Sequence, residues 1–377
     1  MQGPAGTLAY HPVREMNSGL EGFTQDESMK AIVYYQNGSP DVLRLAEIEK
    51  PRCGSGEVLI KVCAAAVNPL DCGSLQGLPY LLGTVFGVRP PAPSHPGRCG
   101  VDFAGLVEGV GRDVAQFKPG DEVFGVCVNN PQARRAKAWV HDQGAFAEYV
   151  SVPESAVVLK PANVTFEQAA SAPVAGLTAL QGLRDKGRIR PGRRVLINGA
   201  AGGVGTFAVQ IAKSFGAEVT AVCSTVNVER VRLAGADRVI DYTREDFTET
   251  GEHYDVIFDC VANHSLTACR KVMNDRGRLI MAGQLGSRLG VAGFLARLAA
   301  ACILSFSSNR KTVTFLAVPK KEDLAILRDL LQAGKLVPVI DRCYRLSEAA
   351  DALRYLMQKH ARGKIVISVS TDAPHHS

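Results

Sequence analysis

The sequence predicts an α/β protein of two parts, a small barrel-like β domain and a doubly wound parallel sheet. The texture of the chain changes near residue 161. Before it, short β segments are broken by Gly and Pro, whereas from residue 194 onward apolar strand-like runs alternate with helical stretches. The length agrees with two domains, because a chain of 377 residues exceeds the roughly 250 residues at which single cores stop growing.

Residues 1–28 precede the first strand-like run and mix Gly, Pro and Ser with acidic residues. They lack the basic start and the apolar stretch of a signal peptide, so we expect a disordered N-terminal tail. The β domain then begins near Met29. Its strands are expected where β-favouring residues cluster between turn residues, at 31–35, 57–62, 104–108 and 146–150.

The second part begins with a helix expected over 165–183, for which Thr165 is a suitable N-cap. Strands are then expected at 195–197, 218–223, 239–240, 254–259 and 277–283, with helices between them. The chain closes with a strand at 313–318, a helix ending at Gly334, a helix after Ser347 and a strand at 364–369. We expect residues 29–160 and 312–377 to form one domain and 161–311 to form the other.

The strongest local signal is a turn of small residues directly after the strand at 195–197. Small residues let the backbone approach a pyrophosphate, and the N–H groups at the start of the following helix meet its charge. Ala200 stands where the usual G-x-G-x-x-G pattern has its first glycine. We predict that a dinucleotide binds to Gly199, Ala200, Ala201, Gly202, Gly203, Val204 and Gly205.

The end of the next strand distinguishes NADH from NADPH. An NADH site usually places a carboxylate there to accept from the ribose 2′-hydroxyl. Residues 222–227 contain no acid, and a 2′-phosphate could instead receive hydrogen bonds from Ser224, Asn227 and Tyr242. The positive charge would come from Arg230, Arg232 or Lys364. We therefore predict NADPH (NADP) as the cofactor and include Lys364 among its contacts.

Motifs along the chain resemble those of the medium-chain dehydrogenase/reductase superfamily. Besides the glycine turn they occupy 58–62, 66–71, 100–111, 117–124, 216–219 and 235–242, in the family's order. The resemblance covers essentially 29–369. It implies a GroES-like β-barrel catalytic domain, a Rossmann cofactor domain with a doubly wound parallel sheet, and an active site in the cleft between them.

Zinc-using members of that superfamily carry Cys, His or Glu ligands at positions that this chain fills differently. The matching residues are Asn68, Val101 and Val174, none of which is a normal zinc ligand. Cys127 stands alone where the zinc branch has four closely spaced cysteines. We therefore predict no zinc and no other metal, and a resemblance to the zinc-independent, quinone oxidoreductase-like branch.

The resemblance singles out three residues with catalytic roles. Asn68 is expected to orient substrate or ribose, although Asn-Pro is also a common turn signal. Thr178 resembles a threonine near the nicotinamide, and its alternative is a hydroxyl bonded to a carbonyl one turn back. Tyr80 is expected to line the substrate pocket and donate a proton, or to pack as a surface aromatic. Asp71 is expected to brace the Asn68 loop.

The absence of metal ligands changes the expected chemistry. Oxidation of a plain alcohol is helped by a metal, whereas an enone or a quinone is already electrophilic. We predict hydride transfer from NADPH to a quinone or to the β-carbon of an α,β-unsaturated carbonyl. The alternatives are an alcohol, aldehyde or enoyl-thioester oxidoreductase, and a non-catalytic NADPH-binding sensor or scaffold.

Composition limits the partners. A net charge of +6 is too mild to predict a nucleic-acid binder. The ten cysteines include no C-x-x-C pair and fit free thiols in a reducing compartment, so we expect a cytoplasmic protein. The apolar segment 291–306 contains Arg297 and is too short for a membrane span, which favours a buried or subunit-interface helix. The superfamily suggests a homodimer.

Overall fold

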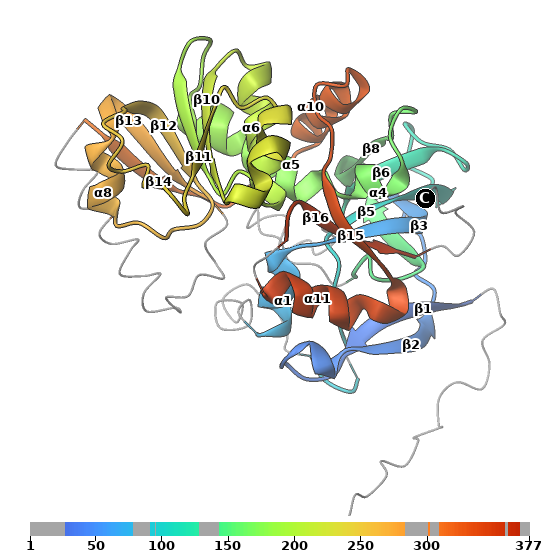
Figure 1. Cartoon of the computed structure of the whole chain (residues 1–377). Coiled ribbons are helices and arrows are strands. Elements are labelled where there is room, and N and C mark those ends of the chain that lie inside the picture. The colour runs from blue at the N-terminus through green and yellow to red at the C-terminus, as the bar shows by residue number, and fades with distance from the viewer. Residues whose placement is uncertain are drawn as a thin grey trace, which may run out of the picture.

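A computed structural model of the chain describes residues 27–77, 91–94, 96–127, 143–282, 301, 309–358 and 361–369. Tyr80 and all of the segment 291–306 except Ala301 lie outside these residues. The described chain forms two lobes, one built on a six-stranded sheet and the other on a seven-stranded sheet with a three-stranded sheet beside it (Figure 1).

The seven-stranded sheet belongs to the β lobe and runs in the order β15-β16-β3-β5-β6-β8, with β7 pairing to β3. All of its pairs are antiparallel except β15 with β16. Strands β2, β1 and β4 form the smaller sheet. The elements of this lobe are β1 (Ser28–Tyr34), β2 (Arg44–Glu49), β3 (Glu57–Val67), α1 (Pro69–Leu75), β4 (Gly97–Arg98), β5 (Asp102–Val110), β6 (Glu122–Val126), β7 (Tyr149–Pro153), β8 (Val157–Leu159), α4 (Phe166–Ala170), β15 (Ile340–Arg345), α11 (Ala349–Met357) and β16 (Lys364–Ser368).

The residue pattern of β3 explains its central place in that lobe. Val58, Ile60 and Val62 alternate with less buried residues and point into the core, as expected for a strand with one face covered. The last part of the strand, 64–67, is buried on both faces. This fully buried end leads directly into the loop at Asn68.

The second lobe contains a parallel sheet in the order β11-β10-β9-β12-β13-β14. In this doubly wound order the connections run in opposite directions from β9 and β12, and ligands bind at such a switch point, beyond the carboxyl ends of the strands. The elements are α5 (Pro173–Gln181), a π-helical turn (Gly182–Gly187), β9 (Arg194–Asn198), α6 (Gly203–Ser214), β10 (Glu218–Cys223), α7 (Val228–Leu233), β11 (Arg238–Asp241), β12 (Tyr254–Asp259), α8 (Leu266–Lys271), β13 (Met273–Met281), β14 (Lys311–Thr314) and α10 (Lys321–Gln332).

Three elements differ from their sequence predictions. The single helix expected over 165–183 is interrupted, because α4 ends at Ala170 and α5 restarts with Pro173 at its first position, where a missing N–H is harmless. β7 starts at Tyr149, and Phe146 instead bonds to Ile32 and Cys99 through its backbone. The strand expected at 313–318 is β14, which pairs with β13 in the parallel sheet, although residue 312 was expected to begin the return to the β lobe.

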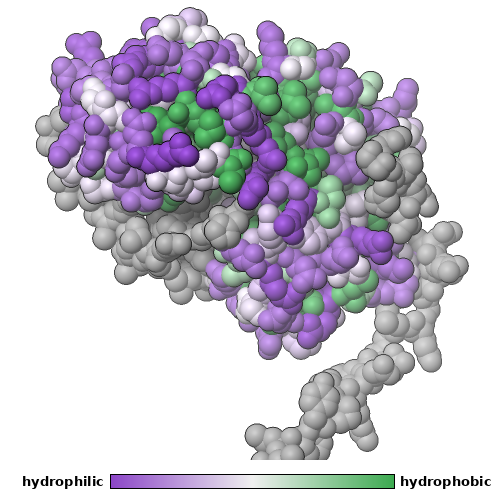
Figure 2. All heavy atoms as spheres, in the orientation of Figure 1, coloured by the Kyte–Doolittle hydropathy of each residue, from purple (hydrophilic) through white to green (hydrophobic). Residues whose placement is uncertain are grey.

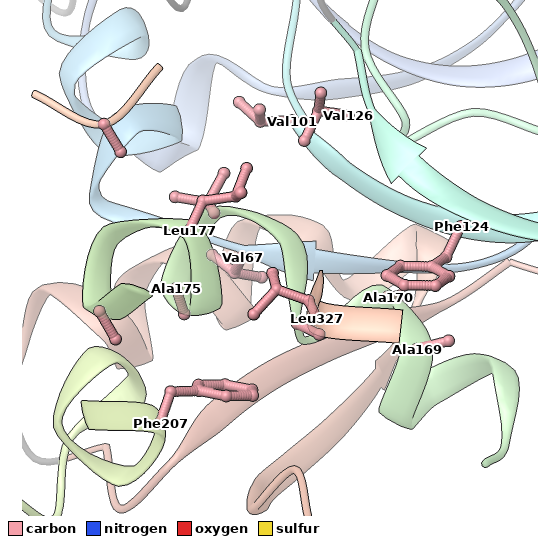
Figure 3. Packing of buried hydrophobic residues seen from close by; sticks show 14 of the residues in the cluster. Val67, Val101, Phe124, Val126, Ala169, Ala170, Ala175, Leu177, Phe207 and Leu327 are labelled. Atoms are coloured by element: carbon pink, nitrogen blue, oxygen red, sulfur yellow. The ribbon is translucent and has the colours of Figure 1, made fainter. Parts of the chain in front are cut away.

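The two lobes share one apolar core along α5, α6 and α10. Gly176 of α5 lets Leu327 of α10 come so close that an added Cβ would stand 2.9 Å from its side chain. Figure 3 shows Leu327 and Phe207 of α6 converging on this helix, near Val67 of β3. On the face in Figure 2, apolar residues gather between the lobes, in the region of α6 and α10.

Polar side chains fasten the same seam. Gln210 of α6 both donates to and accepts from the backbone of Val337, at 3.0 and 2.7 Å. Gln181 of α5 donates to Asp323 of α10 at 2.7 Å. These side-chain amides bond to specific backbone and carboxylate groups. They therefore fix how the helices lie against each other and how the two lobes meet.

Candidate active site

The glycine turn lies at the switch point between β9 and β12. Gly199 has φ 85°, a conformation that favours glycine, and its N–H donates to Val222 O of β10 at 3.2 Å. A Cβ added to Gly205 would stand 2.1 Å from Gly199 O, so helix α6 can only pack on this turn without that side chain. Both glycines are therefore required by the shape of the turn.

The start of α6 offers donors to an anion. Within the described chain, the N–H groups of Gly203, Val204 and Gly205 meet no acceptor, as expected in the first turn of a helix. Among the described residues, a Cβ on Gly202 would have one neighbour within 4 Å, Gly199 O at 3.4 Å, so the described chain leaves the space beside this residue open. Open space next to unpaired N–H groups at a helix start fits a pyrophosphate.

At the end of β10, Asn227 is buried and its Nδ2 donates to Ser224 Oγ at 2.9 Å. Its Oδ1 is buried and has no partner among the described residues. Asn227 therefore has an unused acceptor. Its amide nitrogen, which the sequence prediction assigned as a donor to a 2′-phosphate, already donates one hydrogen bond to Ser224. Tyr242 is 59% exposed beside this strand end.

A carboxylate that the sequence prediction overlooked lies on the neighbouring strand end. Asp241 of β11 accepts from Thr225 Oγ1 at 2.6 Å and from the backbone and hydroxyl of Thr243. These hydrogen bonds, led by that of Thr225, lower the pKa of Asp241. Arg244 lies 3.6 Å from the same carboxylate. Asp241 is therefore charged and already committed to local partners.

The three basic residues predicted to supply charge to a 2′-phosphate have different surroundings. Arg232 forms an ion pair with Glu229. Lys364 is buried, 4% exposed, inside the β lobe. Arg230 is exposed, donates to Arg362 O at 2.8 Å and forms no ion pair within the described chain.

The far wall of the switch point is a turn after β12 that sequence reasoning missed. Asp259 accepts from Val261 N at 3.0 Å and Ala262 N at 2.9 Å, and Ala262 adopts φ 61°. Asn198, at the end of β9, donates to Asp259 Oδ1 at 2.9 Å. A Cβ on Gly199 would touch Val261, so this turn closes on the glycine turn. The signal available in the sequence was an Asp at the end of an apolar strand.

On the β-lobe side, Asp71 braces the loop at Asn68, as the sequence suggested. Its carboxylate accepts from Asn68 N at 2.7 Å and from Gly100 N at 2.8 Å. The side chain is fully buried, and burial raises the pKa of Asp71 to about 7. The two backbone bonds join the start of α1 to the segment before β5.

Asn68 itself is 2% exposed, and its amide is turned into the lobe. Its Nδ2 donates to Ala66 O at 3.2 Å and to Asp102 Oδ2 at 3.0 Å, and its Oδ1 accepts from Lys364 Nζ at 2.6 Å. Both donors of the amide are therefore used, and only one lone pair of Oδ1 is left for another group.

Asp102, at the start of β5, is the centre of this network and has no exposed surface. Besides Asn68, it accepts from Val174 N at 3.0 Å, in the first turn of α5. The ammonium of Lys364 lies 3.7 Å away. Burial raises the pKa of Asp102 to about 6 against the effect of Lys364, and burial also lowers the pKa of Lys364. The converging donors favour a carboxylate here.

Thr178 follows Val174 by one helical turn and donates to its carbonyl at 2.7 Å. The hydroxyl of Thr178 thus donates its proton inside α5, which is the alternative that the sequence left open. The lone pairs of the hydroxyl oxygen can still accept. The side chain is half-buried. Asp102 fixes the start of the helix that carries this hydroxyl.

Two parts of the chain match known protein families. Residues 54–162 match the family described as alcohol dehydrogenase GroES-like domain, and residues 234–367 match the family described as zinc-binding dehydrogenase. Over 346 residues the chain is 34% identical to an NADPH-dependent alkenal/one oxidoreductase, chloroplastic, of Arabidopsis thaliana, which covers 90% of this chain and 80% of that relative. It belongs to the medium-chain dehydrogenase/reductase superfamily.

Two further members of the superfamily support this assignment. A quinone-oxidoreductase, chloroplastic, of Triphysaria versicolor is 33% identical over 351 residues, covering 90% of this chain and 98% of the relative. The solved structure of the quinone oxidoreductase from Coxiella burnetii superposes with a TM-score of 0.76 and 31% identity over 91% of this chain and 100% of that one. The β lobe is thus the GroES-like domain and the parallel-sheet lobe the Rossmann domain of the superfamily.

Asn68, Val101 and Val174 are the residues that the sequence prediction matched to the zinc ligands of other medium-chain dehydrogenases. Both valines are buried hydrocarbon. No group of three His, Cys, Asp or Glu side chains suited to a metal occurs in the part of the chain that the structure describes. Within that part, no helix is long and apolar enough to cross a membrane.

Proposed function

We propose that this chain is an NADPH-dependent, zinc-independent oxidoreductase that transfers a hydride to a quinone or to the β-carbon of an α,β-unsaturated carbonyl. One observation carries the proposal. A glycine turn suited to a dinucleotide lies at the switch point of the Rossmann domain, and the residues predicted to match zinc ligands are two buried valines and an asparagine whose two N–H donors are used. The names of the relatives, alkenal/one and quinone oxidoreductases, agree with this chemistry.

The donor set supports a zinc-free reaction. A catalytic zinc needs three protein ligands that supply sulfur, imidazole nitrogen or carboxylate oxygen. Val101 and Val174 offer only hydrocarbon, and Oδ1 of the Asn68 amide already accepts from the Lys364 ammonium at 2.6 Å. A substrate that is electrophilic without a metal, such as an enone or a quinone, suits this surface better than a plain alcohol.

When bound, NADPH supplies the hydride. The residues of this chain bind and orient: the N–H groups at the start of α6 would hold the pyrophosphate, and the turn at Asp259 closes the opposite wall. The hydroxyl of Thr178 donates to Val174 O, so towards a ligand it acts as an acceptor. Because Asn68 and Thr178 have no spare donor, polarisation of the substrate carbonyl falls to Tyr80, a backbone N–H or water; Tyr80 stays a prediction.

We attribute the preference for NADPH over NADH to the positive charge of Arg230. Of the three basic residues near the strand end, it is the one that is exposed and not held in an ion pair within the described chain. Asp241, a carboxylate at the end of the neighbouring strand β11, is hydrogen bonded to Thr225 and Thr243. A 2′-phosphate would therefore meet the donors of Ser224 and Tyr242 together with one cation. The location in the cytoplasm and the homodimer stay predictions.

The test is oxidation of NADPH by a panel that holds a benzoquinone, a simple enone, an enoyl thioester and an aldehyde, each repeated with NADH and with a chelator. We expect turnover of the quinone or the enone that prefers NADPH and survives the chelator. Turnover confined to the aldehyde and lost with the chelator would refute the zinc-free proposal. Tight binding of NADPH without turnover of any member would instead indicate a sensor or scaffold.

A further inference from the structure

We propose that Lys364 and Asp102 are positioning residues that tie the glycine turn of the cofactor site to the Asn68 loop on the substrate side. The proposal rests on the proposed function, since it states how this chain aligns the two halves of the same site. It is carried by a buried network that draws its members from four places in the chain: the ends of β3 and the starts of β5, α5 and β16.

The ammonium of Lys364 lies among three oxygen atoms. Lys364 Nζ donates to Asn68 Oδ1 at 2.6 Å and to Val67 O at 3.2 Å, and lies 3.7 Å from Asp102 Oδ2. Two of the three ammonium protons are therefore donated, and the Asp102 carboxylate lies at ion-pair distance. The charge of Lys364 is directed into the GroES-like domain, at the Asn68 loop.

The side chain of Lys364 passes beside the glycine turn before its ammonium reaches Asn68. A Cβ added to Gly203, the first residue of α6, would stand 3.1 Å from Lys364 Cδ and 3.4 Å from Gly363 O. The stem of Lys364 therefore lies on the glycine turn, while its ammonium reaches Asn68. A single side chain thus touches the cofactor turn and the substrate loop, and a displacement of either end moves the other.

Asp102 contacts both the Asn68 amide and the first turn of α5. Its two oxygens accept from Asn68 Nδ2 and Val174 N, and it lies beside the ammonium. Removing the cation would leave this fully buried carboxylate without a counter-charge and Asn68 Oδ1 without its donor. The amide of Asn68 would then lose the contact at its oxygen, and the carboxylate that accepts from its nitrogen would have lost its counter-charge.

A direct contact to the cofactor phosphates would give Lys364 a different behaviour. A lysine that binds the 2′-phosphate discriminates NADPH from NADH, and a lysine that binds the pyrophosphate contributes equally to both affinities. A positioning lysine contributes to neither. It acts on the rate at saturating cofactor, because misalignment by about 1 Å is enough to cost on the order of 100-fold in rate.

The experiment measures the dissociation constants of NADPH and NADH, from the fluorescence of the reduced nicotinamide, together with kcat for Lys364→Met and Lys364→Arg in the full chain. We expect kcat of Lys364→Met to fall about 10- to 100-fold. Both dissociation constants should stay within about threefold of wild type, and Lys364→Arg should recover most of the loss because it keeps the cation. Lys213→Met, at a half-exposed surface ion pair with Asp237, serves as the matched control and should keep full activity.

A second readout does not depend on turnover. Hydrogen exchange of the backbone N–H groups at Asn68, Asp71 and Gly100 should accelerate in Lys364→Met and return toward wild type in Lys364→Arg. If Lys364→Met fails to fold, the charge-neutral Asp102→Asn/Lys364→Met pair takes its place, with the same expected loss of kcat. A wild-type chain that binds NADPH but reduces no substrate refutes the proposed function and leaves hydrogen exchange to decide the inference.

Three results would overturn the proposal. A selective loss of NADPH affinity would make Lys364 a 2′-phosphate contact. An equal loss of both cofactor affinities with unchanged kcat would make it a pyrophosphate contact. Unchanged kcat and unchanged exchange at the Asn68 loop would show that the buried network does not position the site.

Discussion

Adding a single methyl group at Gly202 should weaken cofactor binding by on the order of 100-fold without disturbing the fold. Of the atoms in the described part of the chain, the new Cβ would meet only Gly199 O, at 3.4 Å, which is ordinary van der Waals contact. The backbone of Gly202 is extended, with φ −81° and ψ 174°, so alanine is tolerated there. The open space beside this residue is where the pyrophosphate should approach the backbone most closely.

The magnitude follows from that geometry. A methyl group in the pyrophosphate path must push the anion away from the unpaired N–H groups of α6, which removes charge-assisted hydrogen bonds worth about 1.5–3 kcal/mol each. Losing one or two of them weakens binding by on the order of 100-fold, since each 1.4 kcal/mol is about a factor of ten. The free energy of unfolding without cofactor should change by less than about 0.5 kcal/mol.

Gly205→Ala is the contrasting variant in the same turn. Its Cβ would stand 2.1 Å from Gly199 O and 2.8 Å from Ala200 Cα, both backbone atoms, so α6 and the turn must separate by about 1 Å. Overpacking of this kind costs about 1–3 kcal/mol of stability. Gly205→Ala should therefore lower both the unfolding midpoint and NADPH affinity, whereas Gly202→Ala lowers only the affinity.

The assay pairs a fluorescence titration with NADPH and a urea unfolding curve for each variant. Gly56→Ala, whose added Cβ has no atom of the described residues within 4 Å, controls for the effect of alanine itself. Should Gly202→Ala bind NADPH as tightly as wild type, the pyrophosphate does not lie beside this residue and the reading of the glycine turn is wrong. A midpoint of Gly205→Ala equal to that of wild type would contradict the steric argument.

Two further predictions concern charge. Burial raises the pKa of Asp71 from 3.8 to about 7, so its contribution to stability is complete below about pH 4 and is lost as the pH rises through about 7. The unfolding midpoint of wild type relative to Asp71→Asn should fall over that window; a difference independent of pH would contradict the assignment. Arg230→Gln should weaken NADPH about tenfold and leave NADH unchanged, whereas Arg232→Gln, whose arginine pairs with Glu229, should affect neither; equal effects of the two variants on NADPH would rule out a specific role for Arg230.

The cofactor turn was predictable from the sequence because its physics is local. A strand, a run of small residues and a helix start lie within a dozen residues, and the structure forms them as β9, the turn and α6. The parallel order of the sheet follows from alternating strands and helices. The break at Pro173 could have been foreseen, since a proline favours the first position of a helix over its interior.

The buried network was beyond local reasoning. Lys364 and Asn68 are 296 residues apart in the chain and meet only because β16 pairs with β3, with Ile365 opposite Val67. The motif comparison assigned no role to Asp102. A lone carboxylate at the start of an apolar strand was nevertheless a signal, because a buried charge needs a partner. What the sequence could not give was which cation would supply it.

The commitment of the Asn68 amide was equally hidden. An asparagine before a proline is compatible with a free, substrate-facing amide or with a saturated one, and only the positions of Ala66 O, Asp102 and Lys364 distinguish these cases. The same holds for Thr178, whose hydroxyl bonds inside its own helix. Identity of a residue indicates which bonds it can make, and tertiary contacts decide which bonds remain for a ligand.

The most direct test of the central claim follows the hydride itself. The chain is incubated, with chelator present, with a simple enone and NADPH that carries deuterium at both hydrogen positions of the hydride-bearing carbon of the nicotinamide, and the product is analysed by NMR. The account predicts deuterium on the β-carbon of a saturated ketone. Deuterium on the carbonyl carbon of an allylic alcohol, or a product free of deuterium, would contradict it.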